Sequence, residues 1–382
     1  MRLRHPDGQV VHLAYGTNVH PAEDLPGILT QLDVYAARVR SHLDTAVLGL
    51  GLWLAAPVAA ALAAEPVLRR RLRRELDVRG LEVVTLNGFP YEAFHAPVVK
   101  KAVYLPDWAD PRRLRYTMDL ARVLVDLLPD DAARGSISTL PLGWRDPWDG
   151  PQVGAVNRAL DQLASGLSSL DRPVRVAFEP EPGCIIENTL QATVHLSRVD
   201  TRYLGVCVDL AHLACAWEDP VTAVQRLARA GLPVVKVQVS AALSVEDPGA
   251  PALAAYVEPR FMHQTRSRGC AASFDDLDEA LADLAAGGAG GPWRVHYHVP
   301  LHASPEPPLE ATPDVLRAGL AALLGGSVAG CDHLEVETYT WGVLPVSQRP
   351  TGPRQLAAGM AAELAYARDT LHDLGLKTLE PR

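Results

Sequence analysis

Charge and cysteine are both scarce in this 382-residue chain. Only 21% of the residues are charged, and acidic residues outnumber basic ones by 45 to 36. Because nucleic-acid-binding domains usually show a basic surface, we expect no nucleic-acid partner. The cysteines are odd in number, scattered and without a CxxC pair, which argues against a disulfide framework and a structural zinc site. We therefore expect a cytoplasmic location in which all cysteines stay reduced. The cysteines are Cys184, Cys207, Cys215, Cys270 and Cys331.

Two other features are missing. No GxGxxG or Walker-type loop follows the first expected strand, so no nucleotide cofactor is predicted. No apolar signal segment follows the polar stretch from Met1 to Asp7. The uncharged run from Ala46 to Ala64 approaches the length of a membrane span, but Gly49, Gly51 and Pro57 interrupt it. We expect a buried strand here, followed by a helix that opens near Pro57, and no membrane partner.

Short apolar runs alternate with helical patterns along the whole chain. The expected strands are Val11–Tyr15, Ala46–Leu52, Leu81–Leu86, Gly135–Leu140, Val174–Phe178, Leu204–Val208, Val234–Val239, Trp293–His298 and His333–Thr338. The expected helices include Pro111–Leu128, Val153–Leu170, Pro220–Ala230, Phe274–Ala286, Pro313–Leu324 and Pro353–Leu374. Such alternation indicates βαβ units and a parallel sheet.

This alternation predicts a (β/α)₈ TIM barrel that forms a single domain over residues 1–382, with an extra strand or insertion. A closed barrel needs eight strands, whereas nine are expected, so one of them must lie outside. An inserted loop is expected around residues 241–290. An open, doubly wound sheet is the competing architecture, and the missing phosphate-binding loop disfavours it.

Acidic residues follow two of the predicted strands at the end where a parallel barrel forms its active site. Glu179 and Glu181 follow the fifth strand and share one face, because side chains alternate along extended chain. Glu187 comes six residues later. Asp209 ends the sixth strand and His212 follows three residues on. Asp209 could ligate a metal or cap the next helix, and the sequence allows both roles.

The last three predicted strands add further polar side chains in alternating positions. The seventh strand carries Lys236 and Gln238, the eighth His296 and His298, and the last Glu335 and Glu337. Buried carboxylates repel one another unless a cation or a proton relieves them. The ordered set of oxygen and imidazole ligands predicts a divalent metal site for Mn²⁺, Zn²⁺, Co²⁺ or Mg²⁺.

Polar and aromatic residues after the first and third strands predict a polyol-binding lining. Asn18 and His20 follow the first strand, and Asn87 and Tyr91 follow the third. Trp341 is a candidate for stacking on a sugar face, and His296 for contacting a hydroxyl. We therefore expect a small-molecule partner such as a polyol, sugar phosphate or cyclitol; homo-oligomerisation stays open.

The pattern resembles the xylose-isomerase-like barrel superfamily. Four motifs look similar to the EboE "metabolite traffic" family within it: Gly16–Pro21, Thr85–Tyr91, His296–Pro300 and Glu337–Trp341. The resemblance implies a metal set of Glu179 or Glu181, then Asp209, Gln238 and Glu337. The chain departs from the related epimerases at Gln238, where they usually carry a histidine, and His298 could take that place.

The leading functional hypothesis is isomerisation or epimerisation by proton transfer beside a carbonyl. Glu181 or Glu187 together with Glu337 would move the proton, and His212 and Lys236 would orient hydroxyls or a phosphate. One alternative is a polyol- or metabolite-binding protein without turnover. A third is a metal-dependent phosphodiester hydrolase, although the acidic chain does not indicate the basic groove that such an enzyme needs.

Overall fold

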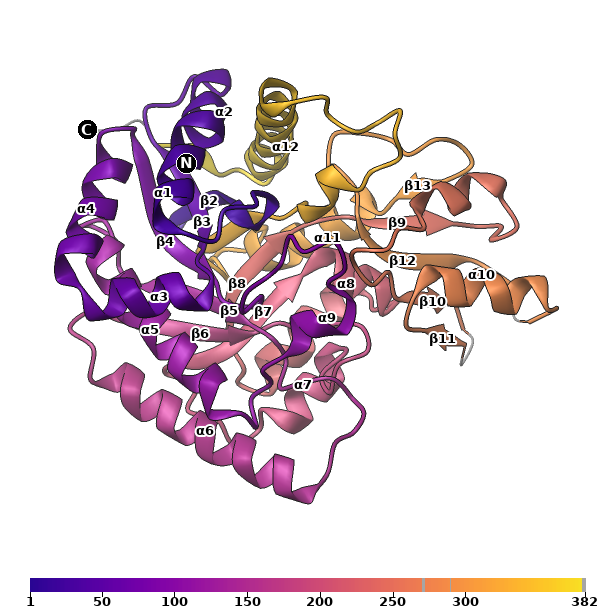
Figure 1. Cartoon of the computed structure of the whole chain (residues 1–382), viewed down its shortest axis with the longest axis horizontal. Helices are drawn as coiled ribbons and strands as arrows, with labels where there is room; N and C mark the ends of the chain where they lie inside the picture. Colours follow the sequence, from indigo (N-terminus) through magenta and orange to yellow (C-terminus); the bar gives the residue numbers. More distant parts are fainter. Residues whose placement is uncertain (270–271, 289, 380–382) are drawn as a thin grey trace.

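Eight parallel strands close into a barrel in the computed structural model, which describes residues 1–269, 272–288 and 290–379 (Figure 1). Strand β14 hydrogen-bonds to β8 on one side and β2 on the other, which closes the barrel. The barrel strands are β2 (Val10–Gly16), β3 (Leu48–Trp53), β4 (Leu81–Asn87), β5 (Gly135–Thr139), β6 (Val174–Phe178), β7 (Leu204–Asp209), β8 (Val234–Val239) and β14 (His333–Val336). The predicted TIM barrel is confirmed.

Helices cover the outside of the barrel (Figure 1). They are α1 (Leu25–Gln31), α2 (Ala37–His42), α3 (Ala56–Ala64), α4 (Pro66–Asp77), α5 (Pro111–Leu127), α6 (Gly150–Ser168), α7 (Thr189–His195), α8 (Leu210–Cys215), α9 (Pro220–Arg229), α11 (Pro313–Leu324) and α12 (Pro353–Asp373). A π-helical stretch, η2 (Leu32–Ala36), joins α1 to α2. Short 3-10 turns are η1 (Thr17–Val19), η3 (Lys100–Tyr104), η4 (Pro251–Tyr256) and η5 (Tyr339–Gly342). Strands β1 (Arg2–Arg4) and β15 (Lys377–Thr378) extend the sheet antiparallel beside β2.

The apolar run from Ala46 to Ala64 divides as predicted into a buried strand, β3, and a helix, α3, with Pro57 in its first turn. Within the described ranges, no helix is both long and apolar enough to cross a bilayer. The thiols of Cys184, Cys207, Cys215 and Cys331 are buried and free, as expected, whereas Cys270 lies outside the described residues.

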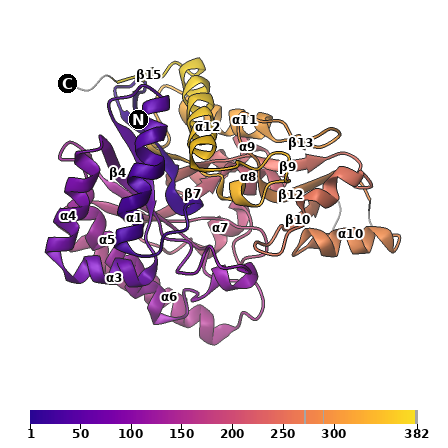
Figure 2. The same ribbon diagram turned by 45° about the horizontal axis from the view of Figure 1, so that its top comes forward.

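The ninth predicted strand, Trp293–His298, is the one that lies outside the barrel. It is β12, and it pairs antiparallel with β9 (Ala242–Val245) and β10 (Thr265–Ser267). With β11 (Ser273–Phe274) and β13 (Glu310–Ala311) these form a five-stranded sheet in the order β11-β10-β12-β9-β13. Helix α10 (Leu277–Ala285) lies beside it (Figures 1 and 2). We call residues 242–311 the inserted sheet.

The inserted sheet occupies the segment where the sequence predicted a loop around residues 241–290. The difference arises because β9, β10 and β11 are only two to four residues long and carry no extended apolar alternation. Their pairing with β12 holds them in place, and such long-range pairing leaves little local signal. Figure 2 shows the sheet projecting from one side of the barrel.

Glycine makes room for charge inside the barrel at one position. A Cβ on Gly51 would lie 1.5 Å from Oε2 of Glu335 on β14. Glu335 and Lys236 are both fully buried there and form an ion pair at 2.9 Å. Charged side chains therefore fill the barrel interior below the carboxyl ends of the strands. Strand β3 can lie beside them only because position 51 is a glycine.

Candidate metal centre

Four carboxylates converge from the ends of three barrel strands. Glu179 and Glu181 follow β6, Asp209 ends β7, and Glu337 follows β14. All four side chains are buried, with at most 5% of each exposed. This placement fits the prediction that strand-end acids meet, because the carboxyl ends of all barrel strands face the same way.

The two carboxylate oxygens of Asp209 have different surroundings. Oδ1 accepts hydrogen bonds from the His212 backbone N–H and the Ser240 hydroxyl, both at 2.8 Å. The first of these bonds caps α8, so the N-cap role foreseen from the sequence is present. Oδ2 is buried without a hydrogen-bond partner. One carboxylate therefore orders the helix and still offers an oxygen to a ligand.

Glu337 is held in the same one-sided way. Its Oε1 accepts from the side-chain amides of Asn18 at 2.7 Å and Asn87 at 2.9 Å. Burial raises the pKa of Glu337 to about 8, and the nearby Asp209 adds to the shift. Two amides from the ends of β2 and β4 thus orient a carboxyl on β14, as supporting groups commonly do for metal ligands.

Glu179 and Glu181 point into the same region. Oε2 of Glu179 is buried without a partner, and Oε1 of Glu181 accepts from the Tyr104 hydroxyl at 2.9 Å. Burial raises the pKa of both carboxyls well above the usual range, and neighbouring carboxylates contribute. Uncompensated acids at this density would oppose folding if all were charged.

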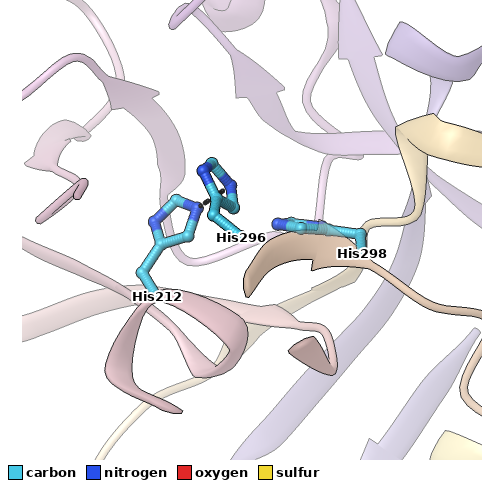
Figure 3. Close-up of side chains that lie close together, drawn as sticks. All are labelled: His212, His296 and His298. Carbon is cyan, nitrogen blue, oxygen red and sulfur yellow. Dashed lines mark hydrogen bonds between the residues drawn. The ribbon is translucent and has the colours of Figure 1, made fainter. Parts of the chain in front are cut away.

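Three histidines complete the cluster (Figure 3). His212 comes from α8, whereas His296 and His298 come from β12 of the inserted sheet. Nε2 of His298 lies 3.8 Å from Oδ2 of Asp209 and has no hydrogen-bond partner. Burial lowers the pKa of His212 to about 4 and that of His296 well below its usual range. Neutral imidazoles are the form that binds metals.

The donor atoms lie close enough together to fit a metal ion. Ligand atoms of Asp209, His298 and Glu337 all lie within 4.8 Å of one another, and so do those of Glu179, Asp209 and His212. Both polar atoms of the fully buried Gln238 side chain also lack partners. Buried polar groups without hydrogen bonds are costly, and a cation would satisfy the oxygen and imidazole atoms of this set. The residues present therefore fit a divalent ion.

A cavity opens above this cluster, with about 510 Å³ of empty space when its open mouth is included. Its polar floor includes Asn18, Asn87, Glu179, Glu181, His212, His296 and Glu337. Its walls are mostly apolar and include Phe89, Phe94, Val99, Phe261, Met262 and Tyr339. A concave, largely apolar pocket with a few convergent polar groups is typical of small-molecule sites.

Several predicted site residues do not reach this cavity. Lys236 lies two residues before Gln238 on β8 and donates hydrogen bonds to Glu335 at 2.9 Å and Ser138 at 3.2 Å. Its predicted contact with substrate hydroxyls or a phosphate is therefore corrected to an ion pair inside the barrel. Glu187 accepts from Arg266 at 2.5 Å and does not line the cavity, which removes the geometric basis for its predicted proton transfer.

Three residues predicted to bind substrate also lie elsewhere. His20 is buried and stacks on Tyr35 with ring centroids 4.0 Å apart. Tyr91 packs edge-on against Tyr116. The Trp341 indole is buried and donates a hydrogen bond to Glu363 on α12 at 2.9 Å. It therefore packs against α12 and is not placed to stack on a sugar. The sequence could not separate these packing roles from binding roles, because the same residue types serve both.

Sequence reasoning missed two residues that hold the centre in place. The Tyr104 hydroxyl reaches Glu181 from η3, and Gln264 from the inserted sheet bonds to Tyr104 and His296. Neither residue stands in a strand-end motif, so nothing local marks it. Tyr339, two residues after Glu337, lies in a motif that the resemblance had indicated, and its position there is the available signal.

Comparisons with known proteins match the fold but not the sequence. No family model and no curated protein matches the chain. An L-ribulose 3-epimerase structure aligns with a TM-score of 0.53 at 11% identity, covering 96% of both chains. A xylose isomerase domain protein from Alicyclobacillus acidocaldarius aligns at 0.52 and 14% identity, covering 95% of this chain and 99% of the other.

A D-allulose 3-epimerase from Methylomonas sp., solved with D-allulose, aligns with a TM-score of 0.50 at 11% identity, covering 96% of this chain and 100% of the other. At such identities the likeness speaks for the fold alone. This chain therefore has the xylose-isomerase-like TIM-barrel fold of known sugar isomerases and epimerases.

Proposed function

We propose that this protein is a divalent-metal-dependent isomerase or epimerase of a sugar, sugar phosphate or cyclitol. The observation that carries the proposal is the one-sided tethering of Asp209 and Glu337. In each carboxylate the hydrogen bonds reach a single oxygen, and the other oxygen is left for a ligand. Buried acids that serve only the fold are normally satisfied on both oxygens.

Asp209, His298 and Glu337 would hold the ion, with Glu179 and the carbonyl oxygen of Gln238 beside them. When bound, the ion supplies Lewis-acid polarisation of a carbonyl and stabilises the negative charge that develops on proton loss. The mixed oxygen and imidazole donors suit Mn²⁺, Zn²⁺ or Co²⁺, and Mg²⁺ less well.

Glu181 and Glu337 are the proposed proton carriers. They reach the cavity from the ends of two different strands, β6 and β14, so a substrate carbon between them would have a carboxyl on either side. The Tyr104 hydroxyl fixes Glu181, and the two asparagine amides fix Glu337. A carboxyl held within hydrogen-bond reach of the substrate contributes about 10²- to 10⁴-fold to such a step.

The cavity walls would position the substrate. Oδ1 of Asn18 is buried without a partner and can accept a hydrogen bond from a hydroxyl. Phe89, Phe94 and Phe261 offer ring surfaces to the C–H face of a ring or chain. His296, which the sequence analysis gave to substrate binding, lines the same floor.

The EboE-like motifs support the same assignment. Asn18, Asn87, His296 and Glu337 come from the four motifs that carry the resemblance, and all four line the cavity. We propose on this basis that the chain is an EboE-type member of the superfamily. A polyol-binding protein on the same barrel is the alternative, and it is distinguished by the absence of proton exchange.

Solvent proton exchange tests the proposal. The Mn²⁺-loaded protein is incubated in D₂O with ketoses, aldose phosphates and inositol ketones, and deuterium at carbon is measured by NMR. We expect exchange with one substrate class and a loss of about 100-fold or more in Glu181→Gln. Glu187→Gln, a matched change outside the cavity, should retain exchange. Binding of a polyol without any exchange would overturn the enzyme assignment in favour of the binding protein.

A further inference from the structure

Three aromatic rings lie together in the apolar wall of the cavity. Phe94 follows β4 on the barrel, Phe261 belongs to the inserted sheet, and Tyr339 follows β14. The ring centroids lie 5.1 Å apart for Phe94 and Phe261, 4.9 Å for Phe261 and Tyr339, and 5.6 Å for Phe94 and Tyr339. We call these three residues the aromatic wall. Met262 lies beside it in the cavity lining and adds further apolar surface.

Hydrogen bonds from both regions of the molecule hold the aromatic wall in place. The carbonyl oxygen of Arg260 accepts from the backbone N–H of Val99 at 2.8 Å. The backbone N–H of Phe261 donates to the Glu258 carboxylate at 2.7 Å. The segment of the inserted sheet that carries Phe261 is therefore tied to the barrel loop that carries Phe94, and the wall is preorganised for a ligand.

The aromatic wall adjoins the proposed metal centre. The ring centroid of Tyr339 lies 4.8 Å from that of His298, and its hydroxyl lies 3.4 Å from Nε2 of His296. A substrate whose oxygens are held at the ion would therefore place its next atoms against the wall. Apolar atoms are favoured there, because each CH₂ group that is buried raises the affinity about fourfold.

The cavity offers no comparable place for an anion. Among the described residues that line it, Lys100 is the one lysine or arginine. Its ammonium group donates to the Asp276 carboxylate and, at 3.3 Å, to the carbonyl oxygen of Glu258, so its charge is already paired. A phosphate on the aromatic wall would lie above the carboxyls of Glu181 and Glu337. Burying an anion without a partner costs far more than an apolar group of similar size gains.

We propose that the substrate is an uncharged hydroxyketone or polyol that carries an apolar substituent, about as large as a phenyl ring, packed on the aromatic wall. The inference rests on the proposed function and narrows its substrate class, because it removes the sugar phosphates. The empty space of about 510 Å³, open mouth included, has room for both parts of such a molecule. Since Phe261 belongs to the inserted sheet, we expect this sheet to set which substituents fit.

Three achiral probes test this inference without reference to turnover or to sugar stereochemistry. Dihydroxyacetone, its phosphate and its phenyl ether share one hydroxyketone and differ in a single substituent. Each probe is titrated calorimetrically into the Mn²⁺-loaded full-length protein. We expect the phenyl ether to bind at least about 20-fold more tightly than dihydroxyacetone, and the phosphate to bind no more tightly than dihydroxyacetone. A phosphate that binds more tightly than dihydroxyacetone, or a phenyl ether that does not, would overturn the inference.

The variant Phe261→Ala tests whether the aromatic wall causes the preference. It should lower the ratio of the phenyl ether affinity to the dihydroxyacetone affinity about tenfold, because packing surface is lost. Phe274→Ala is the matched control, since it makes the same change in the inserted sheet at a ring that contacts Trp293 and does not line the cavity. An unchanged ratio in Phe261→Ala would place the substituent elsewhere and contradict the proposal. The comparison of the three probes on the wild type does not depend on how either variant folds.

The same measurements separate this inference from the proposed function. Tight binding of the phenyl ether without any deuterium exchange would refute the isomerase and keep the substrate class. Deuterium exchange with a sugar phosphate as the preferred substrate would keep the isomerase and refute the substrate class.

Discussion

The barrel and the inserted sheet contribute different chemistry to one centre. The barrel supplies the candidate oxygen ligands, Glu179, Asp209 and Glu337 from β6, β7 and the end of β14, together with one imidazole, His212 on α8. The inserted sheet supplies nitrogen ligands from a single antiparallel strand, β12, at His296 and His298. Oxygen-rich and imidazole-rich donor sets prefer different ions, so the division between the two regions bears directly on which metal the protein selects. In the proposed centre, the inserted sheet supplies two of the ligands, His296 and His298.

The largest effect should come from replacing Asp209, a proposed metal ligand on the barrel. Asp209→Ala is expected to abolish metal binding and to lower proton exchange by at least ~10³-fold, because the Lewis acid is lost. Asp209→Asn keeps an oxygen to cap α8 and should lose metal equally, while its thermal unfolding matches that of the wild type. Elemental analysis and NMR exchange measure both. Unchanged metal content in the alanine variant would remove Asp209 from the centre.

Deeper in the barrel, the Lys236–Glu335 pair should matter for stability. Lys236→Met leaves Glu335 buried without its partner and should lower the free energy of unfolding by about 3–5 kcal/mol. The double variant Lys236→Met/Glu335→Gln should recover part of this loss, because no unpaired charge remains. Urea unfolding followed by circular dichroism gives both values. A loss below about 1 kcal/mol in the single variant would contradict the buried-pair account.

At the boundary between the two regions, Glu363 on α12 should make stability depend on pH. It accepts from the Leu301 backbone N–H, the Thr338 hydroxyl and the Trp341 indole, and burial raises its pKa to about 7. Because the folded pKa exceeds the unfolded one, its stabilising contribution is complete below about pH 4.5 and is lost as pH rises through 7.

The size of this loss is about 3 kcal/mol, since each pKa unit is worth about 1.4 kcal/mol. Glu363→Gln removes the titrating group and should therefore show a flatter stability profile from pH 5 to 8.5. Its amide nitrogen cannot accept a hydrogen bond, so the slopes of the two profiles are compared and not their absolute values. Parallel profiles for the two proteins in urea unfolding would show that Glu363 is not the group responsible.

The smallest effect is expected from the inserted sheet's ligand. His298→Gln should weaken Mn²⁺ binding roughly 10- to 100-fold without abolishing it, because Gln238, which pairs in register with Asp209 and has an unpartnered carbonyl oxygen, can substitute as a weaker donor. Calorimetric titration of metal-free protein measures the affinity, with His302→Gln as the control. An affinity equal to that of the wild type would confine the ion to the barrel carboxylates.

Local sequence patterns predicted the barrel well and the inserted sheet poorly. Val174–Phe178 and Val234–Val239 of the barrel have the predicted bounds, because an apolar run with flanking turns defines a buried strand. In the inserted sheet only Trp293–His298 was predicted as a strand, and its bounds are also those predicted. The alternation of side chains also predicted that Glu179 and Glu181 would face one cavity. The pattern could not show that β12 lies outside the barrel, because strand pairing is a long-range property.

The sequence also could not predict how deep in the barrel each side chain lies. Lys236 and Gln238 share a face of β8, yet only Gln238 lies at the level of the unpartnered ligand atoms, while Lys236 pairs with Glu335 below. Alternation gives the face of a strand but not the layer in which a side chain sits. Tyr104 and Gln264 reach the site from segments without periodic patterns, so only the folded chain brings them there.

Anomalous X-ray scattering from crystals soaked in Mn²⁺ tests the central claim most directly. The account predicts a strong peak bounded by Asp209 and Glu337 on the barrel side and by His298 on the side of the inserted sheet. No peak, or a peak whose ligands all come from the barrel, would contradict the conclusion that the two regions build the centre together.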